Sequence, residues 1–153
     1  MSTAIIITTP DSEIVSSRIV NATIEQVFEA FSKPNHLKNW WGPAGFTNTF
    51  NEFDFRVGGK WNFVMHGPDK GNYANECEFI KIEKPSLIAW KRHSKPLFQV
   101  LFTFEELEKG KTKIVFKMLF DSVAECNKLK PYVTDKNEEN FDKLENELKN
   151  VTA

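Results

Sequence analysis

The sequence predicts an α+β fold, in which one strand, two short helices, six further antiparallel strands and a long C-terminal helix follow one another along the chain. Three observations support this order. Capping motifs mark the helices, turn clusters separate the strand-like segments, and the last segment has an apolar stripe with helical spacing. A long helix laid across a curved sheet of seven strands does not fill the whole concave face. We therefore expect a cavity between the sheet and this helix.

The first strand and the two short helices lie near the N-terminus. Glu13–Val20 is rich in β-branched residues and predicts a strand. The following motif, Thr23-Ile-Glu-Gln26, has the spacing of a capping box and predicts the start of a helix. Pro34 ends this helix and opens a second one, which is expected to stop near Trp41 because a Gly-Pro pair follows.

The middle of the chain predicts an antiparallel meander, because glycine- and proline-containing turns separate its strand-like segments. Alternation is clear at Trp61, Phe63 and Met65, which share one strand face because strand side chains repeat every second residue. The six expected strands cover residues 46–55, 60–66, 73–82, 87–93, 97–107 and 111–119.

The C-terminal part predicts helix. A second capping box begins at Ser122, and Pro131 is expected to interrupt the helix that it starts. A final helix is then expected at about residues 135–150, where Phe141, Leu144 and Leu148 form an apolar stripe.

The charge balance argues against functions that need one sign of charge. The 153 residues include 20 Lys and Arg and 21 Asp and Glu, for a formal net charge of −1 at pH 7, so we expect neither nucleic acid nor a membrane as partner. No apolar stretch has the length of a membrane span, and residues 1–9 lack the features of a secretory signal. We therefore expect one cytoplasmic domain, spanning residues 1–153 with its core at about 12–149, as a monomer or a homodimer.

Metal, cofactor and nucleophile motifs are missing from the sequence. Cys77 and Cys126 do not form a CxxC pair, and the histidines lie on different predicted elements. We expect both cysteines to be reduced, buried and inert, and we expect no metal and no cofactor. The sequence also lacks a GxSxG motif, a phosphate-binding loop and a dinucleotide fingerprint, which favours a protein that is not an enzyme.

Aromatic side chains give the first indication of function. The chain has 14 Phe, 4 Trp and 2 Tyr, most of which cannot form hydrogen bonds and so must pack in a core or line a cavity. Plain core packing is the alternative for each of them. Tyr73 and Trp90 are favoured as ligand contacts because each adds a polar group to an apolar ring, and one of Trp40 and Trp41 is expected at the cavity mouth while the other anchors its helix. The candidate ligand-binding residues are Trp41, Trp61, Phe63, Met65, Tyr73, Trp90, Phe98, Phe116 and Phe141.

Two arginines stand among apolar strand residues. Arg18 and Arg92 either extend their charged ends to solvent or pair with an acidic ligand. The paired carboxylates Glu76 and Glu78 are interpreted instead as marking the solvent-facing side of a strand.

The residues also resemble a known family. The segments 35–46, 58–68 and 117–120 contain Trp-Trp-Gly-Pro, Gly-Gly-Lys-Trp-Asn-Phe-Val-Met and Lys-Met-Leu-Phe. Together they resemble SRPBCC or START-like proteins, and more narrowly the bacterial branch related to the C-terminal domain of the activator of the ninety-kilodalton heat-shock chaperone ATPase. This resemblance spans about residues 12–148. It implies a helix-grip fold, a seven-stranded antiparallel sheet curved around the C-terminal helix.

The resemblance implies three kinds of function. Members of this superfamily bind lipids, sterols, polyketides or other apolar molecules, some bind the chaperone in the stress response, and a few catalyse cyclisation. The leading hypothesis is binding of a small hydrophobic or aromatic molecule between sheet and helix. The alternatives are a chaperone-binding module and a cyclase- or hydrolase-type enzyme that uses Tyr73 or a buried carboxylate as acid. Phe141 stands where members of the family commonly carry a small or aliphatic residue, and its ring is expected to narrow the cavity.

Overall fold

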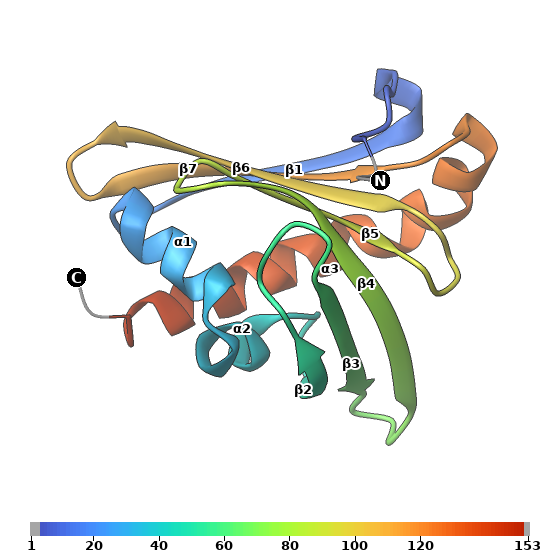
Figure 1. Ribbon diagram of the computed structural model, residues 1–153, viewed down its shortest axis with the longest axis horizontal. Helices are drawn as coiled ribbons and strands as arrows, with labels where there is room; N and C mark the ends of the chain where they lie inside the picture. The colour runs from blue at the N-terminus through green and yellow to red at the C-terminus, as the bar shows by residue number, and fades with distance from the viewer. Residues whose placement is uncertain (1–3, 152–153) are drawn as a thin grey trace.

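The computed structural model describes residues 4–151 and confirms the predicted α+β order (Figure 1). The strands are β1 (Glu13–Val20), β2 (Thr47–Phe53), β3 (Lys60–His66), β4 (Asn72–Glu83), β5 (Leu87–Arg92), β6 (Gln99–Glu108) and β7 (Lys111–Leu119). The α-helices are α1 (Ile24–Ser32), α2 (Pro34–Trp40) and α3 (Val123–Leu148), and a short 3-10 turn spans Pro10–Ser12. No helix within residues 4–151 is both long enough and apolar enough to cross a membrane.

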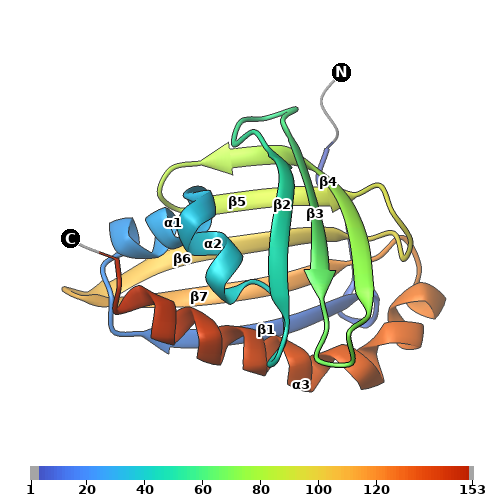
Figure 2. The ribbon, with the colours of Figure 1, turned by 90° about the horizontal axis from the view of Figure 1, so that it is seen from below.

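All seven strands form one antiparallel sheet in the order β1-β7-β6-β5-β4-β3-β2. Figure 1 shows the sheet arching over α3, and Figure 2 shows that β2 and β3 cross the direction of β5, β6 and β7 when seen from below. The sheet is therefore strongly curved, and its concave face is the one that α3 covers. This arrangement confirms the helix-grip fold.

The two short helices begin as the sequence predicts. Thr23 caps α1, because its hydroxyl accepts a hydrogen bond from the Gln26 backbone nitrogen at 3.1 Å and its own backbone nitrogen donates to the Gln26 side chain at 2.8 Å. Pro34 opens α2, which ends at Trp40. Gly42 follows at a φ of 103°, in the left-handed region where glycine is favoured.

The predicted break at Pro131 is wrong, because α3 runs through this proline as one helix of 26 residues. A proline inside a helix removes one hydrogen bond and costs about 3 kcal/mol. Here Pro131 and Asn127, whose carbonyl loses its partner, are both exposed, so water can satisfy the free oxygen. Apolar contacts with the core continue on both sides of the proline, at Cys126, Leu129 and Val133. These residues share one helix face, which keeps the helix on its path.

Strand ends differ from the prediction by one or two residues. β2 begins at Thr47 and ends at Phe53, so Phe46 and Phe55 flank it. β6 begins at Gln99, because residues 93–96 form a bend and Leu97, which follows it, is 51% exposed. Phe98 therefore lies just before the strand.

Aromatic rings fill the space between the helices and the sheet. Phe31 of α1 lies 4.6 Å from Phe102 of β6 and 4.7 Å from Trp40 of α2, measured between ring centroids. The indole nitrogen of Trp40 donates to the Ala30 carbonyl at 3.0 Å. Trp40 is thus the tryptophan that anchors the short helix.

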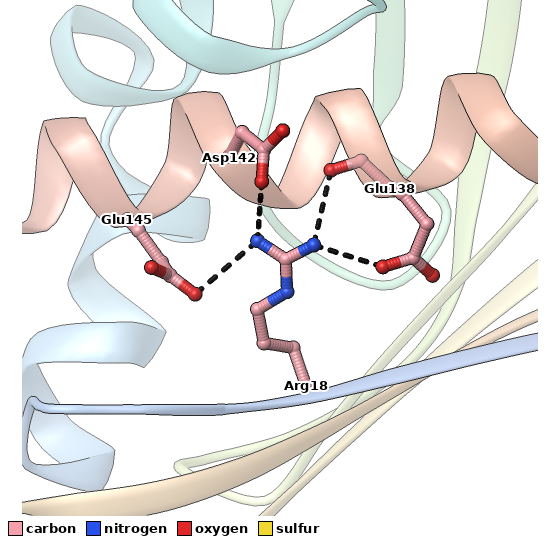
Figure 3. A network of polar contacts seen from close by, with 4 residues as sticks. All are labelled: Arg18, Glu138, Asp142 and Glu145. Atoms are coloured by element: carbon pink, nitrogen blue, oxygen red, sulfur yellow. Dashed lines mark hydrogen bonds and ion pairs between the residues drawn. The ribbon is translucent and has the colours of Figure 1, made fainter.

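Arg18 joins β1 to α3 (Figure 3). Its guanidinium contacts Asp142 at 2.6 Å, Glu138 at 2.8 Å and Glu145 at 3.3 Å, all on α3. Burial disfavours the charged guanidinium, but hydrogen bonds to these carboxylates outweigh it and raise the pKa of Arg18 above its ordinary value. Because the three carboxylate side chains are 44–70% exposed, each pair contributes at most about 1 kcal/mol to stability. Arg18 therefore has its acidic partners within the chain.

Candidate ligand-binding cavity

A cavity of about 200 Å³ lies between the concave face of the sheet and α3. Strands β3 to β7 supply one wall, α3 supplies the opposite wall, and the segment after α2 closes one side. The expected space between sheet and helix is therefore present. The lining residues are Trp41, Gly42, Pro43, Phe63, Met65, Asn75, Cys77, Trp90, Arg92, Phe98, Val100, Phe116, Met118, Val133, Lys136, Asn137 and Asn140.

The size of this cavity limits what it can hold. Pockets for drug-sized molecules measure roughly 300–1,000 Å³, whereas an engineered apolar cavity of about 150 Å³ holds benzene. A volume of about 200 Å³ therefore suits one substituted ring or a short branched chain. A surface groove beside α1 is larger, about 590 Å³, but apart from Phe28 it is lined by polar and charged side chains.

Most of the candidate ligand-binding residues lie at this cavity. They come from the segment after α2, from β3, β5 and β7, and from the turn before β6, so the curved sheet brings together rings that are far apart in the sequence. The six that line it are Trp41, Phe63, Met65, Trp90, Phe98 and Phe116. Trp41 is the tryptophan at the cavity, in the role that the sequence left open between Trp40 and Trp41.

Two further candidates lie behind the lining. Trp61 is fully buried, and its ring stacks on Phe63 at 4.4 Å and lies 5.7 Å from Trp41. Phe141 of α3 is also buried and meets Phe116 edge-on at 6.2 Å. Both rings support the wall without facing the cavity, so the structure gives Trp61 and Phe141 a packing role.

Tyr73 lies outside the cavity. It is 47% exposed, at the outer end of β4 opposite Met65. Its hydroxyl donates to the Asp69 carboxylate at 3.1 Å, and this hydrogen bond raises the pKa of the Tyr73 phenol. A raised pKa makes the phenol a weaker acid, and its position separates it from the cavity. Tyr73 is therefore not placed to act as an acid there.

The sheet contributes polar groups that the sequence analysis did not assign to the site. Asn75 and Cys77 of β4 are the cross-strand partners of Phe63 and Trp61, so their side chains share the concave face. Cys77 is buried, as predicted, and burial raises the pKa of its thiol to about 12. The thiol therefore stays protonated at neutral pH, although its position in the cavity wall was not expected.

Arg92 is the cationic group of the sheet wall. Its Nε donates to the Pro96 carbonyl at 2.9 Å and its Nη2 to the Ser94 hydroxyl at 3.2 Å, while Nη1 donates to the Asn75 amide oxygen. The guanidinium also lies 5.1 Å from the centre of the Phe98 ring. Burial lowers the pKa of Arg92 from its ordinary value. These contacts fix the guanidinium at the cavity wall.

Two asparagines form the polar part of the α3 wall. The amide nitrogen of Asn137 donates to the Met118 sulfur at 3.5 Å. The Oδ1 atom of Asn140 is buried and has no hydrogen-bond partner within the described chain. Sequence spacing could have indicated both, because Asn137 and Asn140 precede Phe141 and Leu144 on the same helical stripe.

The segment after α2 is fastened to α3. The Lys143 ammonium donates to the Phe46 carbonyl at 2.9 Å and to the Pro43 carbonyl at 3.3 Å, and burial lowers the pKa of this lysine. The Ala44 backbone nitrogen donates to the Glu139 carboxylate at 3.1 Å. These bonds hold the Trp41 side of the cavity in place.

A curved antiparallel sheet that grips a C-terminal helix, with a cavity between the two, defines the START-like class. The sequence matches the family described as Activator of Hsp90 ATPase homolog 1-like protein over residues 21–149, and the chain belongs to this family. No curated protein sequence matches it significantly.

Solved structures share this fold at low sequence identity. A crystal structure of a protein from Nitrosomonas europaea has a TM-score of 0.84 at 16% identity, covering 93% of this chain and 97% of that one. A solution structure from Arthrobacter aurescens has a TM-score of 0.84 at 21% identity, with 98% and 93% covered. The crystal structure of the AHSA1 protein from Silicibacter pomeroyi has a TM-score of 0.72 at 18% identity, covering 90% of this chain and 97% of that one.

Proposed function

We propose that this protein binds a small hydrophobic or aromatic molecule between the sheet and α3. The observation that carries the proposal is the cavity of about 200 Å³ with its largely apolar lining. Burial of apolar surface supplies the driving force, at roughly 25 cal/mol per Å² before the costs of association. We also propose that the protein is cytoplasmic, as its sequence favours.

The aromatic rings of the wall favour a flat ligand. Trp41 lies 5.4 Å from Trp90 in an edge-to-face arrangement and 6.1 Å from Phe116 in a tilted one. Rings at different angles offer both faces and edges, which are the surfaces on which another aromatic ring packs. A single-ring molecule therefore suits the wall better than a long acyl chain.

Filling the cavity is expected to abolish ligand binding. Val133 lines the cavity from α3 and is only partly buried, so Val133→Trp adds a ring that takes up ligand space while the helix keeps its place. We expect p-cresol and toluene to bind the wild-type protein and to bind this variant at least tenfold more weakly. Ligand-observed NMR and isothermal titration measure both affinities.

The matched control places the same new residue on the same helix outside the cavity. Val123 is 44% exposed at the start of α3, so Val123→Trp is expected to bind both probes like the wild type. Equal binding by Val133→Trp and Val123→Trp would remove the cavity as the binding site. Failure of the wild type to bind either probe would remove the proposed function.

Binding to a heat-shock chaperone is a second candidate, favoured by the match to the activator family. We expect the protein at micromolar concentration to raise the ATPase rate of the chaperone from the same organism. Val133→Trp should raise it equally if the chaperone binds an outer surface rather than the cavity. An unchanged ATPase rate with the wild-type protein rejects this candidate and leaves ligand binding unaffected.

A further inference from the structure

The charges at the cavity wall have one sign. Arg92 and Lys136 line it, and none of its lining residues is an aspartate or a glutamate. This differs from the whole chain, in which acidic residues slightly outnumber basic ones. Lys136 is exposed at the rim, whereas Arg92 is partly buried in the sheet wall. The charged side chains that line the cavity are therefore both cationic, although the protein as a whole is not basic.

Arg92 has no carboxylate partner within ion-pair distance among residues 4–151. Its hydrogen bonds go to neutral oxygens of Asn75, Ser94, Lys95 and Pro96. Charges removed from water are normally paired, and Arg18 in the same protein has three carboxylate partners. A guanidinium has five N–H donors, so the four bonds leave one hydrogen of Nη1 for a ligand. Arg92 therefore has no counter-ion among residues 4–151, and a bound anion would provide one.

The opposite wall carries an unsatisfied acceptor. Asn140 is 6% exposed, and its Oδ1 accepts no hydrogen bond within the described chain. A buried polar atom without a partner costs about 1–3 kcal/mol. A hydroxyl or N–H group on the ligand would supply the missing donor.

We propose that the ligand is a small apolar carboxylic acid that also carries a hydroxyl or amino group. This inference rests on the proposed function and names the ligand class for the same cavity. The carboxylate pairs with Arg92 on the sheet wall, the donor group bonds Asn140 on α3, and the apolar ring or chain lies among Trp41, Trp90 and Phe116. Lys136 at the rim adds attraction for the approaching anion.

The test compares acids with neutral probes of the same shape on the wild-type protein. The three hydroxybenzoate isomers and their amides differ in charge but hardly in size. We expect at least one hydroxybenzoate to bind ten times more tightly than its amide by isothermal titration. Equal affinities would overturn the ligand class but leave the proposed function standing if the amides or p-cresol bind. If no probe binds, both proposals are lost.

Arginine variants then assign the charge to one residue. Arg92→Gln is expected to weaken hydroxybenzoate binding at least tenfold while p-cresol binding, which also reports that the cavity is intact, stays unchanged. Arg56→Gln makes the same substitution at an arginine whose side chain is 69% exposed and outside the cavity lining, and it should leave both affinities unchanged. Unchanged hydroxybenzoate binding by Arg92→Gln would overturn the role of Arg92. If Arg92→Gln does not fold, the comparison of each acid with its amide on the wild-type protein still decides whether the ligand class is right.

The donor group is tested separately. Asn140→Ala is expected to remove most of the preference for the best hydroxybenzoate over benzoate, because the hydroxyl loses its acceptor. Benzoate itself should bind this variant about as well as it binds the wild type. A preference that persists in Asn140→Ala would overturn the contact with Asn140.

Discussion

Replacing Gly59 with alanine is expected to lower the free energy of unfolding by roughly 3 kcal/mol or more, as severe overpacking does. A Cβ atom at this position would lie 2.0 Å from the Asp54 carbonyl oxygen and 2.9 Å from the Arg56 carbonyl oxygen. Both are backbone atoms and cannot rotate away. The turn before β3 would have to open, which would weaken the bond of 3.0 Å from the Phe79 nitrogen to the Gly59 carbonyl.

The neighbouring glycine provides the matched control. Gly58 has a φ of 85°, and a Cβ added there meets no atom within 4 Å. Gly58→Ala is therefore expected to cost only the left-handed strain of about 1 kcal/mol. Urea denaturation of both variants gives the comparison. Equal stabilities would contradict the steric argument for Gly59.

The order of the elements could be predicted from the sequence because each carries a local signal. The β1 segment matches its prediction at both ends, and the Thr23 capping box forms as expected. The exception is α3, where a local signal for a break at Pro131 is overridden by tertiary packing. The contacts that Leu129 and Val133 make with the core depend on the whole fold, so the rule for proline alone could not predict them.

The rings of the site could be predicted better than its polar groups. Alternation placed Phe63 and Met65 on one strand face, which is the concave face in the structure, and the pairing of β4 with β3 puts Tyr73 on that face as well. The sequence did not show which part of β4 reaches the cavity: Tyr73 lies at the outer end of the strand, whereas Asn75 and Cys77 line the cavity. Depth depends on the curvature of the sheet and on the path of α3, and neither has a local sequence signal.

The two strand arginines show the same limit. Arg18 and Arg92 both stand in predicted strands, and from the sequence either could pair with an acid. The structure separates them: Arg18 contacts carboxylates on α3, such as Asp142, whereas the oxygens that accept hydrogen bonds from Arg92 within residues 4–151 are all neutral. Contacts between residues more than a hundred positions apart decide this difference.

Truncation of Phe102 to alanine is expected to lower the free energy of unfolding by about 3–5 kcal/mol, the usual range for a buried phenylalanine. Phe102 is fully buried, with ring centroids at 4.4 Å to Phe116, 4.6 Å to Phe31 and 5.7 Å to Trp90. Its ring joins α1 to the cavity wall, so its removal leaves a void that no single neighbour can fill. Denaturant unfolding measures the loss.

Leu107→Ala on the same strand is the control, because Leu107 is 48% exposed and its truncation should change stability by less than about 0.5 kcal/mol.

The void left by Phe102→Ala lies behind Phe116 and Trp90, which both line the cavity. These rings can then move back, so the folded variant should bind naphthalene more tightly relative to toluene than the wild type does. Unchanged relative affinities, together with the expected loss of stability, would show that the cavity wall holds its shape without Phe102.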